Sequence, residues 1–337
     1  MSQADPMHDL IRTTLHQANH IALFSHIRPD GDAIGSLLGL GLCLQQAGKQ
    51  VEMILRDGIP QNFRHLPGHE QIKSTPTSNA DLWIILDASD PNRIGGLLDG
   101  RQPDINIDHH VTNLNYARIN FIQPEAVATA AILAESIPLW QLPIPPAAAQ
   151  ALLTGILTDT IGFRTSNMTS DVLRLAANLM DMGADLPELY RRALSTRSYE
   201  SAMYWGQALA RLQRQGTLIW TSLTLQDRQV SGYNGNDDAD LNNILSSIDS
   251  SEVSILFIEQ KNGTVKVSWR AQPGWDVSAL ALEFGGGGHA PAAGADIPGT
   301  LSDVQTRVLQ ATMAWMQASN QKKQSTINHN QTLSGVK

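Results

Sequence analysis

The sequence predicts an α/β protein with two domains, the first of them built on a doubly wound parallel sheet. Three observations support this fold class. Short apolar runs alternate with helical segments over the first half of the chain. A second region, in which polar and apolar residues alternate as in strands, begins near residue 216. His or Asp residues directly follow several of the apolar runs, at the strand ends where parallel sheets bind their ligands.

The first domain is expected to alternate strands with helices. The predicted strands lie at 20–25, 51–55, 82–86 and 105–107. The segment 33–47 predicts a helix that ends at Gly48, because glycine commonly follows a helix C-terminus. Residues 126–161 predict two helices, interrupted by the proline-rich segment 138–146. Residues 170–183 predict an amphipathic helix.

The second domain is expected to be a smaller α+β domain. Its strand-like runs are TLIWTSLTL, SILFIEQ and TVKVSWR, and the Asn-Gly pair at 262–263 predicts a hairpin turn between the last two. Two helices are expected to follow, around 276–283 and 301–317. We therefore predict domains at 1–185 and 215–317, a helical linker at 186–214, and a disordered polar tail at 318–337.

The bulk composition restricts the function. The chain has 337 residues, of which 42% are hydrophobic, so it can bury ordinary cores. Its net charge is −8 and it has no run rich in Lys or Arg, which argues against binding to long nucleic acids and favours short or small nucleotide substrates. The single cysteine, Cys43, excludes a disulfide or a thiolate metal site within one chain. Without a signal peptide or a membrane span, we expect a cytoplasmic protein that binds no membrane.

The segment His26-Ile-Arg-Pro-Asp30-Gly-Asp32 lies between a predicted strand and a predicted helix. It supplies one imidazole and two carboxylates, a ligand set that suits Mn²⁺ or Mg²⁺. Gly31 allows the backbone to turn so that both carboxylates face inward. For Asp32 alone, an equally good interpretation is the N-cap of a helix that begins at Ala33. The segment as a whole favours a metal site.

Two further strand ends carry residues of the same types. Asp87 follows LWIIL, where its carboxylate could bridge two metals, and the turn or cap role fits Asp90 better. Asp108-His109-His110 follows INI. Adjacent histidines point in different directions, so one of them can bind a cation while the other faces the substrate. Asp108 can then orient an imidazole.

Three other features complete the set of candidate site residues. Asp159 lies late in an apolar helix, where a carboxylate is costly unless it is paired or bound to a metal; a helix-end cap or an ion pair with Arg164 are the alternatives. GGGGHAPAAG (285–294) predicts a glycine loop whose N–H groups converge on an anion, with a flexible linker as the alternative. Arg270 is expected to hold a terminal phosphate, with an exposed strand arginine as the alternative.

The order of these motifs supports a family resemblance. HxxPDGDAxGS, a strand-end Asp, DHHxxN, TGxxxDTxxF and GGGGHxxAAG occur in that order. In this respect the chain resembles the DHH phosphoesterase family with a DHHA1 C-terminal domain, over about residues 20–300. The resemblance implies a DHH domain that contains the parallel sheet, a smaller DHHA1 domain, and a catalytic cleft between them. The short two-domain form is similar to stand-alone nanoRNase/pAp phosphatases, whose substrates are short oligoribonucleotides and 3′-phosphoadenosine 5′-phosphate (pAp).

The resemblance also implies a role for each site residue. It implies two Mn²⁺ ions, with Mg²⁺ or another divalent ion as the alternative. The metal ligands would be His26, Asp30 and Asp87 for one ion, and Asp32, Asp87, His109 and Asp159 for the other. His110 and Asp108 would be catalytic, with His110 near the scissile phosphate. The substrate-binding residues would be Arg270, Gly286, Gly287, Gly288 and His289. A homodimer is the family-based expectation.

Three other functions stay open at this stage. A phosphodiesterase acting on cyclic di-AMP or its linear product pApA would have the same motifs. A pyrophosphatase would share the N-terminal metal motifs, but the GGGGH segment argues against it, because that family carries a different, Lys/Arg-bearing second domain. A non-catalytic nucleotide sensor is disfavoured because every predicted metal ligand is in place.

Overall fold

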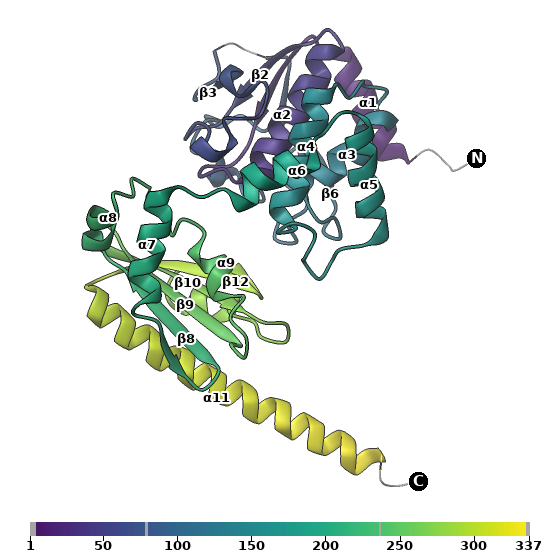
Figure 1. The fold of residues 1–337 in the computed structure, drawn as a ribbon. Coiled ribbons are helices and arrows are strands. Elements are labelled where there is room, and N and C mark those ends of the chain that lie inside the picture. Colours follow the sequence, from purple (N-terminus) through teal and green to yellow (C-terminus); the bar gives the residue numbers. More distant parts are fainter. Residues whose placement is uncertain (1–4, 78–79, 236, 335–337) are drawn as a thin grey trace. The chain divides into compact units, whose positions relative to one another are not determined.

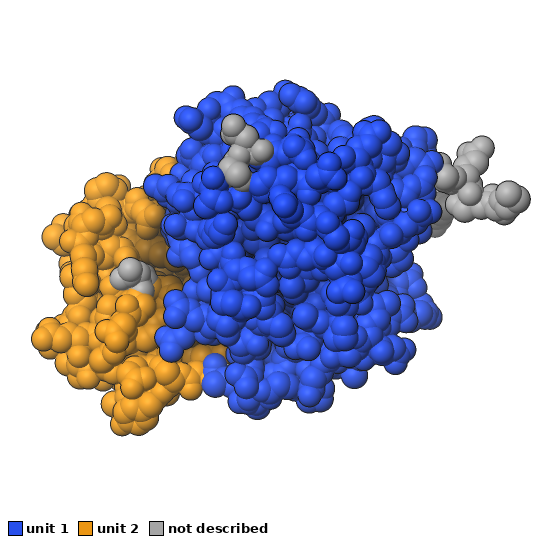
Figure 2. All heavy atoms as spheres, turned by 90° about the horizontal axis from the view of Figure 1, so that it is seen from above, with its two compact units in different colours: residues 1–196 blue, residues 197–337 orange. Residues whose placement is uncertain are grey.

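Residues 5–77, 80–235 and 237–334 are described by the computed structural model. The chain forms two units, residues 1–196 and 197–337, which Figure 2 shows in different colours. The boundary between them falls inside the segment for which the sequence predicts a linker. Over the described ranges, no helix has both the length and the apolar character that a bilayer span requires.

Unit 1 contains a six-stranded sheet in which all neighbouring strands are parallel (Figure 1). The strands are β1 (His20–Phe24), β2 (Gln50–Ile54), β3 (Ile72–Lys73), β4 (Leu82–Leu86), β5 (Ile105–Asp108) and β6 (Ile119–Ile122). Their order in the sheet is β3-β2-β1-β4-β5-β6. The direction of winding reverses between β1 and β4, the position at which such sheets bind ligands. The predicted α/β class is confirmed.

The two faces of this sheet pack into two separate cores. Along β1, Ile21 and Leu23 belong to the larger core, whereas Ala22 and Phe24 belong to the smaller one, as expected from the alternation of side chains in a strand. The helices supply the larger core, and residues 80–98 supply much of the smaller one. The α-helices are α1 (Pro6–Gln17), α2 (Gly31–Gln46), α3 (Thr129–Leu139), α4 (Pro146–Asp159), α5 (Ser170–Asp181) and α6 (Leu186–Tyr190). The short helical turns are η1 (Gln61–Phe63), η2 (His69–Gln71), η3 (Pro91–Ile94) and the π-helical turn η4 (Arg191–Ser195).

Helices α2 and α4 pack closely because glycines line their contact. A Cβ atom on Gly31 would lie 2.2 Å from Thr158 Oγ1, and one on Gly35 would lie 2.5 Å from the Ala151 carbonyl oxygen. Gly31 is the first residue of α2, and Thr158 is the last residue but one of α4. The close approach therefore brings the start of α2 and the end of α4 together, and with them two of the predicted metal ligands.

Unit 2 contains a mixed six-stranded sheet in the order β11-β12-β10-β9-β8-β7. Its strands are β7 (Gln213–Gln215), β8 (Leu218–Leu223), β9 (Val253–Glu259), β10 (Thr264–Ala271), β11 (Gly287–His289) and β12 (Ala292–Pro298). Only β8 and β9 are parallel among the described neighbouring pairs. The helices are α7 (Tyr199–Leu209), α8 (Leu225–Ser231), α9 (Leu241–Leu245), α10 (Ser278–Glu283) and α11 (Leu301–Ser334). The predicted hairpin at 262–263 connects β9 and β10.

Two segments differ from the predicted linker and tail. Helix α7 lies in the predicted linker, but Tyr204 and Ala208 are fully buried in a core of unit 2. Helix α11 continues to Ser334, where the sequence analysis predicts a disordered tail, and residues 335–337 lie outside the described part. The polar composition suggested disorder, but residues 301–334 contain no Gly or Pro and many good helix formers.

Candidate metal centre

Three of the predicted site residues of unit 1 lie at the carboxyl ends of three adjacent strands. His26 follows β1, Asp87 follows β4, and Asp108 is the last residue of β5. The first two are nearly inaccessible, and Asp108 is completely buried. Burial of these ionisable groups far from water is unfavourable unless opposite charge compensates them. A cluster of this kind is therefore a strong candidate for a cation site.

Three overlapping groups of side chains among the described residues are close enough to hold an ion. In each group the candidate ligand atoms lie within 4.8 Å of one another. The groups are His26 with Asp30 and Asp87; Asp32 with His109 and Asp159; and Asp87 with Asp108, His109 and His110. All six residues predicted as metal ligands, and both predicted catalytic residues, thus fall in one connected cluster.

Asp87 belongs to the first and the third of these groups and also faces His109 of the second. Its Oδ2 is 3.5 Å from His26 Nε2, and its Oδ1 is 3.7 Å from His109 Nε2. The two oxygens of one carboxylate thus face two different histidines. Asp87 also has φ = 56°, a left-handed backbone conformation that is uncommon for a residue other than glycine.

The histidines are held through their Nδ1 atoms. His26 Nδ1 lies 2.9 Å from the Ile27 carbonyl oxygen, and His109 Nδ1 lies 3.2 Å from the Ala126 carbonyl oxygen. In the neutral tautomer in which Nδ1 donates to these carbonyls, Nε2 carries the lone pair on the carboxylate side. Metal-binding histidines are typically oriented in this way. The donor set and its support therefore fit a divalent cation.

Asp108 orients His110. Its Oδ1 accepts a hydrogen bond from His110 Nδ1 at 2.7 Å, and its Oδ2 accepts one from Asn113 Nδ2 at 2.6 Å. Buried Asn106 in turn donates to Asn113 Oδ1 at 3.3 Å. Both adjacent histidines lie near Asp87 Oδ1, at 3.6 Å for His110 Nδ1 and 3.7 Å for His109 Nε2, but His109 Nε2 also faces Asp32 and Asp159.

The capping alternative for Asp32 is wrong, since the N-cap of α2 is Asp30. The Asp30 carboxylate accepts hydrogen bonds from the backbone N–H groups of Asp32 and Ala33, both at 3.1 Å, and the helix begins at Gly31. Asp32 is nearly inaccessible, and its carboxylate is directed away from the backbone of its own helix, toward the start of α3.

The cluster carries excess negative charge. Burial, together with the Asp87 and Asp159 carboxylates, raises the pKa of Asp32 well above its usual value. Burial also raises the pKa of Asp159 to about 7. Burial alone would lower the pKa of His26, but hydrogen bonds and charge from Asp30 and Asp87 raise it to about 10. Protons thus compensate the charge in the absence of a cation, and a bound cation would displace them.

Asp159, Arg164 and Arg93 each have a different partner in or near the cluster. Asp159 Oδ2 lies 3.5 Å from His109 Nε2. The alternative ion pair with Arg164 is not formed, because Arg164 Nε donates to the Ile161 carbonyl oxygen at 2.9 Å. Arg93 lies beside the cluster, with Nη2 3.2 Å from His26 Nδ1. It brings a positive charge to the edge of an otherwise acidic site.

The glycine segment of unit 2 differs from the predicted loop. Gly287, Gly288 and His289 form β11, an exposed edge strand that pairs with β12, and Gly286 precedes it. Gly288 has φ = 145°, and a Cβ atom there would lie 2.5 Å from the Ala292 carbonyl oxygen. Close backbone packing therefore requires glycine at position 288, a requirement that was not predicted from the sequence. Arg270 lies on β10, half-buried, and its Nη1 donates to the Trp269 carbonyl oxygen at 3.0 Å.

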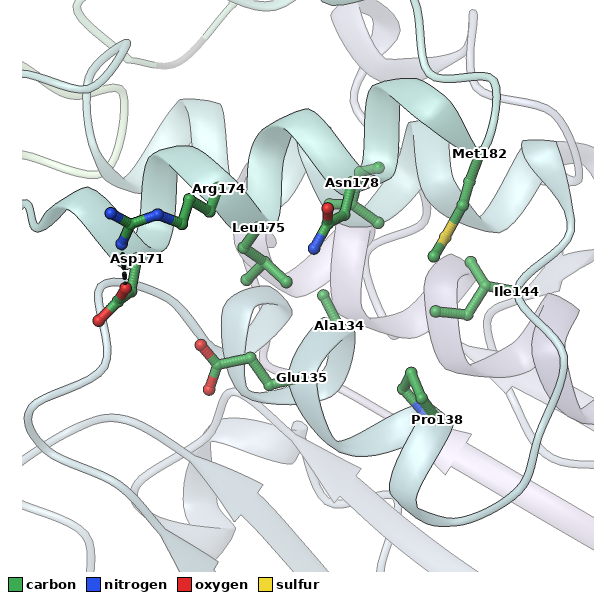
Figure 3. Close-up of a pocket in the computed structure, with 10 residues that line it drawn as sticks. Ala134, Glu135, Pro138, Ile144, Asp171, Arg174, Leu175, Asn178 and Met182 are labelled. Carbon is green, nitrogen blue, oxygen red and sulfur yellow. Dashed lines mark hydrogen bonds and ion pairs between the residues drawn. The ribbon is translucent and has the colours of Figure 1, made fainter.

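A separate groove lies on unit 1 between α3 and α5 (Figure 3). Its volume is about 310 Å³, and Leu175, Met182 and Glu135 are among its lining residues. An ion pair between Arg174 and Asp171 lies at one end. None of the clustered His or Asp residues lines this groove, so it is not part of the candidate metal centre.

One buried side chain of the site was not found from the sequence. Thr129, the first residue of α3, is fully buried and its hydroxyl donates to Asp87 Oδ1 at 3.1 Å. The two residues are 42 positions apart in the sequence. Only the fold brings them together, so no local pattern could have identified Thr129.

The fold and the site together define an α/β protein with an acidic, histidine-containing cluster, a candidate metal centre, at the edge of a parallel sheet. Residues 20–156 match the model of the DHH family, N-terminal domain, and residues 228–318 match the model of the DHHA1 domain. The bifunctional oligoribonuclease and PAP phosphatase NrnA of Thermus thermophilus is 36% identical over 297 residues, 86% of this chain and 88% of that protein. The chain therefore belongs to the DHH family of phosphoesterases, in its form with a DHHA1 domain.

Two further relatives support this assignment. The protein with the same description from Mycoplasma genitalium is 30% identical over 291 residues, which are 84% of this chain and 90% of that protein. The crystal structure of an exopolyphosphatase-related protein from Bacteroides fragilis has a TM-score of 0.88 and 26% identity, and the match covers 94% of this chain and 98% of that chain. Both the sequence and the fold agree over nearly the whole chain, and the protein is a phosphoesterase.

Proposed function

We propose that this phosphoesterase hydrolyses short oligoribonucleotides to mononucleotides, and pAp to AMP and phosphate, with the help of two divalent cations. The observation that carries the proposal is the placement of Asp87, whose two oxygens face His26 and His109 in two neighbouring ligand groups. The substrate class is supported by the names of the Thermus and Mycoplasma relatives.

The residues would divide between two cation sites that share Asp87. The ligands would be His26, Asp30 and Asp87 for one cation, and Asp32, Asp87, His109 and Asp159 for the other. Mn²⁺ suits this mixture of imidazoles and carboxylates, and Mg²⁺ is the alternative. Two such cations act as Lewis acids that polarise a phosphoryl oxygen and make water a stronger nucleophile near neutral pH.

His110 is proposed as the residue that contacts the scissile phosphate. Asp108 fixes its Nδ1–H, so Nε2 is the nitrogen that would hydrogen-bond a phosphate oxygen or the leaving oxygen. The site must stabilise the negative charge that develops on the phosphoryl oxygens and on the leaving oxygen as water attacks phosphorus and the bond to the leaving oxygen breaks. Arg93, next to His26, would add positive charge on the same side of the site.

Unit 2 is proposed to bind the far end of the substrate. Arg270 would hold a terminal phosphate, and Gly286, Gly287, Gly288 and His289 would contact the nucleotide through the edge of the sheet. The net charge of −8 favours short substrates over long nucleic acids. A cytoplasmic location and a homodimer are part of the same proposal.

Hydrolysis by the purified protein tests the proposed function. The substrates are pAp, a labelled RNA dinucleotide, pApA and cyclic di-AMP, each with Mn²⁺ and with EDTA. We expect Mn²⁺-dependent release of phosphate from pAp and of mononucleotides from the dinucleotide. Turnover of cyclic di-AMP and pApA alone would show that the protein is a phosphodiesterase acting on these substrates and not on pAp and short RNA. Tight nucleotide binding without turnover of any of the four would contradict the proposal and favour a sensor.

A further inference from the structure

The N-terminus of α3 points at two of the carboxylates in the candidate metal centre. Its N-cap, Ala128, has no side chain that can accept a hydrogen bond. The first N–H groups of a helix need acceptors from elsewhere. Asp32 supplies them from α2: its Oδ2 accepts from the Thr129 N–H at 2.6 Å, and its Oδ1 accepts from the Ala130 N–H at 2.9 Å. Asp32 thus caps a neighbouring helix, and the capping fixes its carboxylate.

The first residue of α3 also holds the second carboxylate. The Thr129 hydroxyl donates to Asp87 Oδ1 at 3.1 Å. The same Oδ1 lies 3.7 Å from His109 Nε2, while Oδ2 lies 3.5 Å from His26 Nε2. This hydrogen bond therefore selects the rotation of the carboxylate in which one oxygen faces each histidine.

The surroundings leave Thr129 little freedom. Its side chain is fully buried, so water cannot replace the hydroxyl. A Cβ atom on Gly155 of α4 would lie 2.6 Å from Ala130 Cβ and 2.9 Å from Asp32 Oδ1, so α4 packs tightly over the same turn. Three helices therefore meet at the point where α3 contacts the two carboxylates.

We infer that Thr129 is a positioning residue of the metal centre, which orients Asp87 through its hydroxyl and Asp32 through its backbone N–H. The inference rests on the proposed function, because the orientation matters only if the carboxylates hold cations. Outer-shell hydrogen bonds to metal ligands typically contribute about 10- to 100-fold to metal affinity or activity. A buried threonine with a merely structural role would change the stability of the protein without changing its affinity for a metal.

Mn²⁺ binding by Thr129→Val and Thr129→Ser variants tests the inference. Valine keeps the shape of the side chain and removes the hydroxyl, whereas serine keeps the hydroxyl and removes the methyl group. Titration calorimetry, together with the EPR signal of free Mn²⁺, gives the number of bound ions and their affinities. We expect Thr129→Val to bind at least one Mn²⁺ about 10- to 100-fold more weakly than the wild type. Thr129→Ser should bind it with nearly wild-type affinity.

Thr154→Val is the matched control. Thr154 is also fully buried in unit 1, but its hydroxyl donates to the Gln150 carbonyl oxygen of its own helix, α4. The same chemical change there should lower thermal stability, because one buried hydrogen bond is lost. The Mn²⁺ affinity should stay within about twofold of the wild type, because this hydrogen bond does not reach a candidate metal ligand. Circular dichroism melting of every variant separates loss of folding from loss of metal binding.

The outcomes distinguish the inference from the proposed function. If Thr129→Val binds Mn²⁺ as tightly as the wild type, or Thr129→Ser binds it as weakly as Thr129→Val, the inference is overturned. If Thr129→Val does not fold, Thr129→Ala and Thr129→Ser decide, because both lack the methyl group and differ only in the hydroxyl. If the wild type itself binds no Mn²⁺, the proposed function fails and the inference fails with it.

Discussion

The carboxyl edge of the unit 1 sheet and the edge strand of the unit 2 sheet carry the two sets of predicted site residues in different ways. In unit 1 the charged groups are mostly buried, and backbone N–H groups, carbonyls and side-chain amides hold them in place. In unit 2 the glycine strand β11 is exposed, and Arg270 is half-buried on β10.

This difference separates chemistry from substrate recognition. Carboxylates that are buried and held by hydrogen bonds can adopt few orientations. The site that they form can therefore support few reactions. An exposed strand edge can accept single substitutions at its open positions, such as Gly287, without disturbing a core. Variants of the unit 1 cluster should therefore abolish the reaction, whereas variants of unit 2 should mainly change the affinity for substrates.

The largest effect is expected at Asp87. Asp87→Ala removes the carboxylate that faces both His26 and His109, and should lower kcat/KM by more than about 100-fold, the upper range for outer-shell partners. The measurement is steady-state hydrolysis of pAp by metal-depleted protein reloaded with Mn²⁺. Asp90→Asn is the control, since Asp90 only caps the short turn η3. Full activity in Asp87→Ala would show that Asp87 does not bridge the two sites.

A smaller effect is expected at Arg270, and mainly on KM. Loss of a charged hydrogen bond to phosphate typically costs about 1.5–3 kcal/mol, or roughly 10- to 100-fold. Arg270→Gln should raise KM for pAp by about that factor while kcat changes little. Lys266→Gln, which removes another cation from β10, should leave KM near the wild-type value. A fall in kcat at unchanged KM would instead place Arg270 at the reacting phosphate.

Two adjacent glycines of β11 allow a matched test of backbone geometry. Gly288→Ala places a Cβ atom 2.5 Å from the Ala292 carbonyl oxygen at φ = 145°, and should destabilise unit 2 by about 1–3 kcal/mol. At Gly287 no atom lies within 4 Å of the added Cβ, so the stability of Gly287→Ala should change by less than about 0.5 kcal/mol. Chemical denaturation measures both. Equal destabilisation by the two variants would contradict the packing explanation.

The last expected effect, seen only without metal, is a pH dependence of stability. Burial raises the pKa of Asp159 from 3.8 to about 7, so the folded state favours the protonated form. This contribution to stability is complete below pH 4 and disappears as the pH rises through 7. In EDTA, the Tm of the wild type should fall more steeply between pH 4 and pH 8 than that of Asp159→Asn, by about 2–4 °C for each kcal/mol involved. If Tm falls equally with pH in the wild type and in Asp159→Asn, then ionisation of Asp159 does not destabilise the metal-free protein.

Most of the unit 1 site could be predicted from the sequence because it follows strand ends. His26, Asp87 and Asp108 each come directly after an apolar run, and the carboxyl ends of parallel strands meet at one edge. The strand-end rule does not apply to Asp32 and Asp159, because both residues lie on helices. Asp159 reaches the cluster because glycines let α2 and α4 approach closely, and this approach was not predicted from the sequence.

The parts that could not be predicted depend on contacts between distant segments. The N-cap of its own helix was an alternative to metal binding for Asp32, but Asp32 caps α3 instead. Thr129 contacts Asp87 across 42 positions of sequence. The GGGGH segment was predicted as a loop whose N–H groups converge on an anion, yet pairing with β12 makes Gly287, Gly288 and His289 a strand. The polar tail was predicted to be disordered, whereas helix propensity is sufficient for α11 to continue to Ser334.

The central claim is that the cluster holds two divalent cations that share Asp87. The most direct measurement is the number of Mn²⁺ ions bound per chain, determined by titration calorimetry on metal-depleted wild-type protein at neutral pH. The account predicts two ions per chain, and protons released on binding, as carboxylates and His26 lose the protons that compensate the cluster. A single ion per chain, or binding that Asp87→Ala leaves unchanged, would contradict it.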